Sequence, residues 1–191
     1  MEQIVDPAFG TLIFKPYNAA VGDWKKQDHL ELLGGLIPLE IEGSADGPTE
    51  DQRQTYLAFK RADRGLRAEL QEALFQFYQI QREQYADVYA EICSRDPEFS
   101  EEDFIPILAK PEDIWGILTP DSWTILGAES ADYHFKVLGS RCDVRLSWHG
   151  CWDTEHEFSA FYEGDKLLGI GILEYFYRLD DLQAVAGGTG N

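Results

Sequence analysis

Residues 148 to 157, WHGCWDTEHE, contain two histidines, one cysteine, one aspartate and two glutamates beside two tryptophans. No other stretch of the 191 residues gathers so many side chains that could bind a metal or exchange a proton. In one extended strand, alternate side chains lie on the same face. The expected faces are His149, Cys151, Asp153 and Glu155 on one side, and Trp148, Trp152 and His156 on the other.

Strand geometry argues against a metal site built from this segment alone. Residues two apart along a strand are separated by roughly 6.5 to 7 Å, so no more than two of them would reach one small ion. The cysteines Cys93, Cys142 and Cys151 show no CxxC spacing that would complete a zinc site. We therefore expect neither a metal nor a cofactor.

A metal-assisted or acid–base enzyme is the alternative interpretation, with candidate residues His149, Asp153, Glu155 and His156. The chain lacks GxSxG, HExxH and a glycine-rich phosphate loop, which are the patterns that would give these groups catalytic partners. We favour a structural role and assign no catalytic residue. The expected structural signature is Trp148 and Trp152 in the core, with Asp153, Glu155 and His156 ordering the chain around them.

The first half of the chain predicts strands followed by helices. Residues 9 to 42 contain apolar runs around a Gly34-Gly35 turn, which is typical of a hairpin or meander. Thr49 and Gln52 have the spacing of a capping box and predict a helix over residues 50 to 62. After a break or bend at Gly65, apolar residues at helical spacing predict a long helix over residues 66 to 93.

The second half predicts an antiparallel meander. A short helix from Pro111 to Pro120 precedes five apolar segments separated by turn-forming residues. The expected strands cover residues 122–129, 132–139, 142–153, 155–164 and 166–175. The sequence thus predicts a single α+β domain over residues 1–183, with an N-terminal hairpin or meander, two central helices and a C-terminal meander, followed by a flexible tail over residues 184–191.

Composition favours a folded cytoplasmic protein. Hydrophobic residues make up 44% of the chain and aromatic residues 13%, which is enough for a sizeable core. The first residues do not have the pattern of a secretion signal, and no apolar stretch is long enough to span a bilayer. Three cysteines are too few and too uneven in number for a disulfide framework, so we expect reduced thiols.

Charge is the most unusual bulk property, because 35 acidic residues oppose 16 basic ones and the net charge is -19. Residues 94 to 191 alone carry 19 acidic and 7 basic residues. Such a field repels nucleic acid and anionic membranes and accelerates encounter with a basic protein. The candidate residues for contact with such a partner are Glu101, Glu102, Asp103, Asp180 and Asp181.

The segment CWDTEH resembles the W-D-x-E-H-G signature of a family of uncharacterised bacterial domains. The residues that carry the resemblance are Asp6, Phe9 and Gly10, then Ile114, Trp115 and Leu118, then Trp152, Asp153, Glu155 and His156. The chain departs from the pattern at Glu157, where the family has glycine, so the backbone there is expected to differ. The resemblance implies an α+β fold and, for some members, genes that resemble toxin-immunity loci.

These observations together predict an acidic binding protein, an immunity-type inhibitor of a basic toxin domain such as a nuclease. Two alternatives stay open from the sequence. One is the enzyme described above, and the other is a homodimer of housekeeping function that forms through the aromatic long helix.

Overall fold

The computed structural model describes residues 1–191 apart from residues 1, 19, 97, 173, 174 and 189–191, with only the backbone described for residues 101, 154, 155 and 185–188. The strands are β1 (Gln3–Asp6), β2 (Gly10–Pro16), β3 (Gly22–Leu30), β4 (Gly35–Gly43), β5 (Leu118–Ile125), β6 (Val144–Gly150), β7 (Asp153–Glu163), β8 (Lys166–Ile172) and β9 (Tyr175–Arg178). The helices are α1 (Glu50–Arg95), α2 (Glu101–Phe104), the 3-10 helix η1 (Pro111–Gly116), α3 (Ala128–Leu138) and α4 (Leu179–Gly188).

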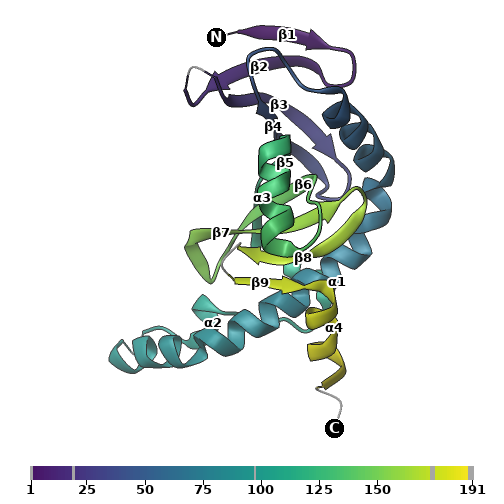
Figure 1. Ribbon diagram of the computed structural model, residues 1–191. Helices are drawn as coiled ribbons and strands as arrows, with labels where there is room; N and C mark the ends of the chain where they lie inside the picture. Colours follow the sequence, from purple (N-terminus) through teal and green to yellow (C-terminus); the bar gives the residue numbers. More distant parts are fainter. Residues whose placement is uncertain (1, 19, 97, 173–174, 189–191) are drawn as a thin grey trace.

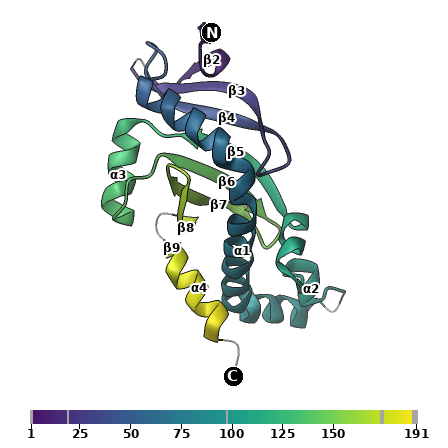
Figure 2. The same ribbon diagram turned by 90° about the vertical axis from the view of Figure 1, so that its right-hand side faces the viewer.

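The described strands form one curved sheet in which each strand lies beside its neighbour in sequence (Figure 1). Neighbouring strands are antiparallel except for the parallel pair β4 and β5, which α1 connects. Helix α1 follows one face of the sheet and α3 lies on the other, as the two views show (Figures 1 and 2). The predicted α+β fold, with N-terminal strands, a long central helix and C-terminal antiparallel strands, is confirmed.

The N-terminal strands form the predicted meander. Strands β3 and β4 pair from Gly22 with Gly43 to Leu30 with Gly35. The turn between them contains Gly34 at φ +77°, a left-handed conformation that favours glycine because a Cβ atom would be strained there. The Gly34-Gly35 pair in the sequence therefore predicted this turn correctly.

Helix α1 begins at the predicted capping box. The Thr49 hydroxyl accepts a hydrogen bond from the backbone N–H of Gln52, and the Gln52 side-chain oxygen accepts one from the N–H of Thr49. The buried Gln52 amide also donates to the carbonyls of Glu42, at 2.7 Å, and Leu126, at 3.2 Å. One side chain thus starts the helix and ties it to the ends of β4 and β5.

The helix does not break at Gly65, so the two predicted central helices are one element of 46 residues. A glycine inside a helix costs about 1 kcal/mol relative to alanine, which is too little to end a helix that is anchored beyond it. Arg67 provides such an anchor, because it donates to the Leu32 carbonyl and lies 4.5 Å above the ring of Trp115. The helix curves strongly along the sheet and changes direction along its length (Figure 1).

Large aromatic side chains fill the core between α1 and the sheet. Phe59 of α1 is fully enclosed, with ring centroids 5.8 Å from Trp123 and 5.2 Å from Tyr162. Trp24 and Trp148 are also fully buried on the same face of the sheet. Each of these rings removes a large apolar area from water, and the core is the main source of stability.

The predicted strand over residues 132–139 is wrong, because this segment lies in helix α3. The strand was predicted from an apolar segment between turn-forming residues, yet its apolar side chains Tyr133, Phe135 and Val137 are exposed. The buried residues are Ala131, His134 and Leu138, whose spacing fits one face of a helix. Gly139 ends the helix in a left-handed conformation, at φ +70°.

The C-terminal end also differs from the expectation. Residues 184 to 188, placed in a tail by their composition, continue helix α4. Helix α4 packs on α1 and β8, and its Leu182 side chain is fully buried. Residues 189–191 lie outside the described part of the chain. None of the described helices is both long and apolar enough to cross a membrane.

Candidate functional site

The segment WHGCWDTEHE forms a hairpin, because the strand predicted over residues 142–153 ends earlier than expected, at Gly150. Strand β6 ends at Gly150, which pairs with Asp153 at the start of β7, and Cys151 and Trp152 make the turn. The Trp152 ring folds back over Gly150, where an added Cβ atom would lie 2.5 Å from the ring. The glycine therefore creates the space that lets Trp152 enter the core.

Both tryptophans of the segment are buried. The Trp152 ring lies 4.8 Å from Tyr78 of α1 and 5.4 Å from Phe158 of β7, measured between centroids. Trp148 also stacks on Phe158, with 6.0 Å between the ring centroids. These rings join the hairpin to the middle of α1, and two of them, Trp152 and Phe158, line a pocket.

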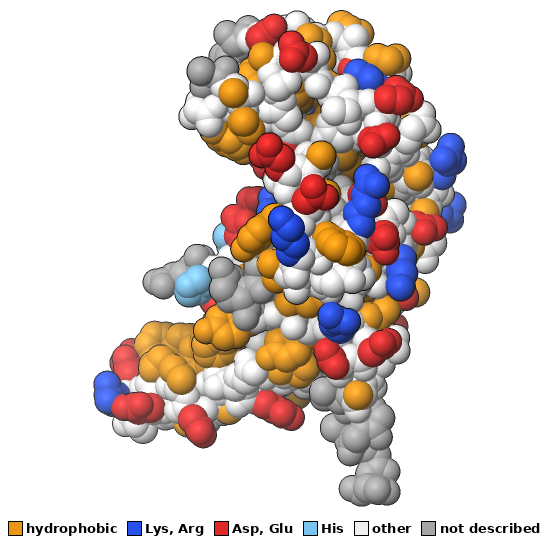
Figure 3. Space-filling view, viewed as in Figure 1, with side chains coloured by type: hydrophobic (Ala, Val, Ile, Leu, Met, Phe, Trp, Pro, Cys, Tyr) orange, Lys and Arg blue, Asp and Glu red, His pale blue; other side chains and the backbone are white. Residues whose placement is uncertain are grey.

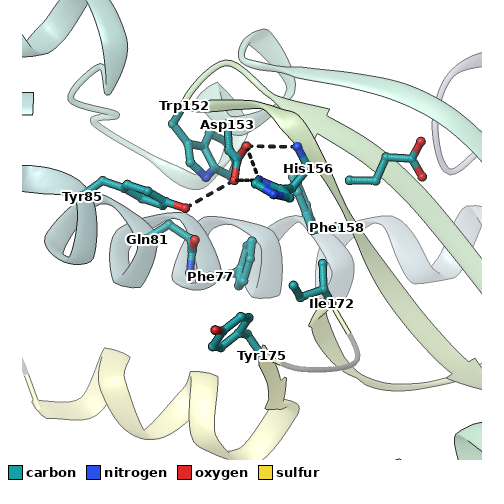
Figure 4. A pocket seen from close by; sticks show the side chains of 10 residues that line it. Phe77, Gln81, Tyr85, Trp152, Asp153, His156, Phe158, Ile172 and Tyr175 are labelled. Atoms are coloured by element: carbon teal, nitrogen blue, oxygen red, sulfur yellow. Dashed lines mark hydrogen bonds and ion pairs between the residues drawn. The ribbon is translucent and has the colours of Figure 1, made fainter. Parts of the chain in front are cut away.

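The pocket has a volume of about 150 Å³ and lies between α1, the β6–β7 hairpin and the last two strands (Figure 4). Most of its wall is apolar and aromatic, and its polar groups come mainly from β7. The lining residues are Phe77, Gln81, Tyr85, Trp152, Asp153, His156, Glu157, Phe158, Ile172 and Tyr175. A largely apolar cavity with a few convergent polar groups is the usual form of a binding site.

Asp153 organises the polar side of this pocket (Figure 4). Its carboxylate accepts hydrogen bonds from the backbone N–H of His156, at 3.0 Å, and from the Tyr85 hydroxyl, at 3.3 Å. The Nδ1 atom of His156 lies 2.9 Å from the same carboxylate and donates to it, since an ionised carboxylate only accepts. The His156 side chain is 68% exposed to solvent.

Tyrosines from α1 support the hairpin as hydrogen-bond donors. Burial and the Asp153 charge raise the pKa of Tyr85, and burial together with Tyr85 raises the pKa of Tyr89. Both hydroxyls therefore keep their protons at neutral pH. The Tyr89 hydroxyl donates a hydrogen bond to the carbonyl of Trp152, and this bond holds the turn in place.

Cys151 does not have the environment of a reactive thiol. Its sulfur lies 3.8 Å from the Phe104 carbonyl and is partly desolvated, although the residue as a whole is exposed. Desolvation raises the pKa of this thiol, which opposes formation of the thiolate that nucleophilic chemistry requires.

The structure separates the polar residues that a single strand would have placed together. His149 and Asp153 do not belong to one cluster of side chains, because the hairpin places His149 opposite Glu157. Its Nε2 atom lies 3.6 Å from a carboxylate oxygen of Glu157. The side chain of Glu155, a predicted member of the signature, lies outside the described residues. Asp121 of β5, which the sequence did not single out, joins His149 and Glu157.

The acidic residues proposed for partner contact do not form one patch. Glu102 and Asp103 are exposed on α2, and Asp180 and Asp181 are exposed on α4. These two helices lie on opposite sides of α1 (Figures 1 and 2). The side chain of Glu101 lies outside the described residues.

A projecting arm is the main surface feature that the sequence did not predict. We define the arm as the described residues from Gln79 to Phe104, which comprise the end of α1, the connection after it and α2, and it extends from the body of the molecule (Figure 1). Every residue of α1 from Gln79 onwards is described, and none is buried. Stacked rings hold α2 on the helix, with Tyr89 5.0 Å from Phe104.

A model of a protein family described as a domain of unknown function, DUF6985, matches residues 8–176. Comparison with curated proteins and with solved structures found no match. The family match spans most of the sheet, all of α1 and the pocket, in agreement with the expected resemblance to an uncharacterised domain family. The chain therefore belongs to the DUF6985 family.

Proposed function

We propose that this domain is an acidic binding protein that captures a basic protein partner. The acidic charge and the family resemblance favour a bacterial toxin domain, such as a nuclease, as this partner. In this proposal the acidic protein acts in the cytoplasm as the immunity-type inhibitor of the toxin. A net charge of -19 supports this role, because an acidic surface mimics the phosphate backbone that a nuclease binds and accelerates association.

The arm is the observation that carries the proposal. Residues 79 to 104 contain eight acidic and two basic residues. Both basic side chains are engaged locally, since Arg95 pairs with Glu91 and Arg82 donates to the Ile105 carbonyl. The charge of the arm is therefore available to a basic partner.

The same arm also exposes apolar side chains, which a purely solvating surface does not need. Val88 is 50% exposed, Ile92 40% and Phe99 48%. Hydrophobic side chains gather along the upper edge of the arm, and acidic ones line its lower edge and tip (Figure 3). Apolar contacts within an acidic rim are the usual composition of an interface that combines affinity with charge selection.

The pocket at the base of the arm adds a second element to this proposed interface. Gln81 and Tyr85 belong to both the arm and the pocket wall. Aromatic rings beside the carboxylates of Asp153 and Glu157 suit the side chain of a lysine or arginine, through cation–π contact and charge. We therefore place an arginine or lysine of the partner in this pocket.

Co-expression with the product of the adjacent gene in the native host tests the proposal. We expect a stable complex with a basic protein and rescue of cells from that protein's toxicity. Val88→Arg should abolish both, because it places a bulky cation in the proposed interface. Val137→Arg is the matched control, since Val137 is 44% exposed on the distant helix α3 and should leave the complex intact.

The proposal is wrong if no basic partner binds. It also fails if the two arginine variants weaken the complex equally, because the arm would then have no special part in binding.

A further inference from the structure

A second group of polar residues lies on the sheet away from the core that α1 covers. Asp121 of β5, His149 of β6 and Glu157 of β7 come from three neighbouring strands. Trp148 is buried in the core, so the adjacent His149 points to the opposite face of the sheet. His149 is partly exposed, and Asp121 and Glu157 are exposed.

The strand register explains why these three side chains meet. His149 pairs directly with Glu157 on one side and with Thr119 on the other. The pairing of β5 shifts between Pro120 and Ser122, so Asp121 is the extra residue of a β-bulge. A bulge changes the direction in which a side chain points. Here the Asp121 carboxylate at the bulge lies beside the cross-strand pair of His149 and Glu157.

Distances within the group suit a shared ion better than a direct hydrogen bond. One ligand atom from each residue lies within 4.8 Å of the other two. The 3.6 Å between His149 Nε2 and Glu157 exceeds a normal N–H···O distance. Two ligands bound tetrahedrally at 2.0–2.2 Å are roughly 3.4 Å apart, so this pair already has nearly the spacing that zinc requires.

Apart from His149, the two carboxylates have no lysine or arginine partner within the described part of the chain. No lysine or arginine described there forms an ion pair with Asp121 or Glu157. Two negative charges held close together repel each other, and a cation between them removes that cost.

We propose that Asp121, His149 and Glu157 bind one divalent transition-metal ion, with Zn²⁺ as the preferred ion. An imidazole nitrogen with two carboxylate oxygens suits zinc and its neighbours, whereas Mg²⁺ and Ca²⁺ prefer oxygen ligands alone. Three protein ligands leave a fourth position open to water or to a group from another molecule. Glu157 also lines the pocket proposed for the partner, so the two sites share this carboxylate, whereas Asp121 and His149 belong to the metal site alone.

The second nitrogen of His149 limits the expected affinity. This Nδ1 atom is buried and has no hydrogen-bond partner among the described residues. A metal-bound histidine normally donates this second N–H to an acceptor, and loss of such support weakens binding about 10- to 100-fold. We therefore expect affinity below that of a closed structural zinc site.

Titration of the chelator-treated chain with Zn²⁺ at neutral pH tests the site. We expect one ion per chain, with Asp121→Asn, His149→Gln and Glu157→Gln each weakening binding at least about tenfold. His156→Gln is the matched control and should bind normally, because His156 belongs to the Asp153 group. In the unmodified chain, Zn²⁺ should shift the imidazole NMR signals of His149 and leave those of His156 unchanged.

Equal affinity in all four variants and the unmodified chain would show that Zn²⁺ merely condenses on an acidic surface, and the site would be disproved. Loss of binding in His156→Gln alone, or an NMR shift confined to His156, would place the metal in the pocket and equally overturn the proposal. The NMR readout needs no substitution, so a variant that fails to fold does not leave the question open.

Discussion

The two halves of helix α1 have one continuous backbone but very different surroundings. From Glu50 to Tyr78 the helix buries a row of side chains against the sheet, including Phe59 and Leu74. From Gln79 to Arg95 it buries none and forms the arm. Tyr85 and Tyr89 hold the start of the arm through hydrogen bonds to Asp153 and to the Trp152 carbonyl.

Under the proposed function, this difference separates stability from recognition along a single helix. Burial of apolar area stabilises the first half, whereas the second half depends on helix propensity and on the contacts at its base. A surface that contributes little to folding can carry exposed apolar and acidic side chains without a large stability cost. The arm is therefore suited to binding, and substitutions along α1 should have sharply different effects in its two halves.

The largest effect is expected for Phe59→Ala in the packed half. Phe59 is fully buried between Trp123 and Tyr162, so its removal leaves a cavity as well as lost apolar burial. We expect a loss of about 3–5 kcal/mol in the free energy of unfolding, measured by urea denaturation. A loss below about 1 kcal/mol would contradict the view that this half of the helix anchors the fold.

Gly150→Ala tests whether the hairpin at the boundary between the halves is tightly packed. The added methyl group would lie 2.5 Å from the Trp152 ring, and the ring or the turn must move. We expect a loss of about 1–3 kcal/mol and a change in tryptophan fluorescence. Gly43→Ala is the control, because a Cβ atom added there meets nothing within 4 Å. An equal loss of stability in that variant would refute the packing argument.

Asp6→Asn tests the ion pair that anchors the first turn of α1. Burial raises the pKa of Asp6, but hydrogen bonds from the Ala8 and Phe9 backbone and from Arg53 outweigh this and bring it below its usual 3.8. A lowered folded pKa contributes stability above the unfolded pKa, and that stability is lost as pH falls through the folded pKa.

At neutral pH we therefore expect Asp6→Asn to cost about 1.5 kcal/mol of unfolding free energy. The gap between the variant and the unmodified chain should narrow as the pH falls below 3.8, as measured by denaturation at several pH values. A gap that stayed constant with pH would show that the carboxylate charge does not contribute.

The smallest effect is expected for Val88→Ala on the arm. Val88 is half exposed, and alanine has the higher helix propensity, so the free energy of unfolding should change by no more than about 0.5 kcal/mol. Urea denaturation beside Phe59→Ala gives the direct comparison. A loss of several kcal/mol would show that the arm packs against something in solution, such as a second copy of the chain.

Local signals predicted much of the fold correctly. Thr49 and Gln52 revealed the start of α1 because a capping box is formed by residues three apart. Gly34 revealed the β3–β4 turn because its left-handed backbone favours glycine. In both places, the hydrogen bonds or the backbone conformation involve only near neighbours in sequence.

Predictions failed where packing between distant segments decided the outcome. The short apolar segment over residues 132–139 fitted a strand as well as a helix, and the burial of Ala131, His134 and Leu138 on one face accompanies the helix. The WHGCWD segment looked continuous because nothing local announced that the Trp152 ring would fold over Gly150.

The amino-acid order was sufficient to establish an α+β domain with strong acidic charge, a capped long helix and an aromatic core. Those properties follow from composition, from periodicity and from hydrogen bonds between near neighbours. The projecting arm, the pocket around Asp153 and the meeting of Asp121 with His149 and Glu157 depended on the tertiary structure. The pocket and the Asp121 group join residues that lie far apart in sequence, which only strand register and helix packing bring together, and the arm is defined by where the sheet stops covering α1.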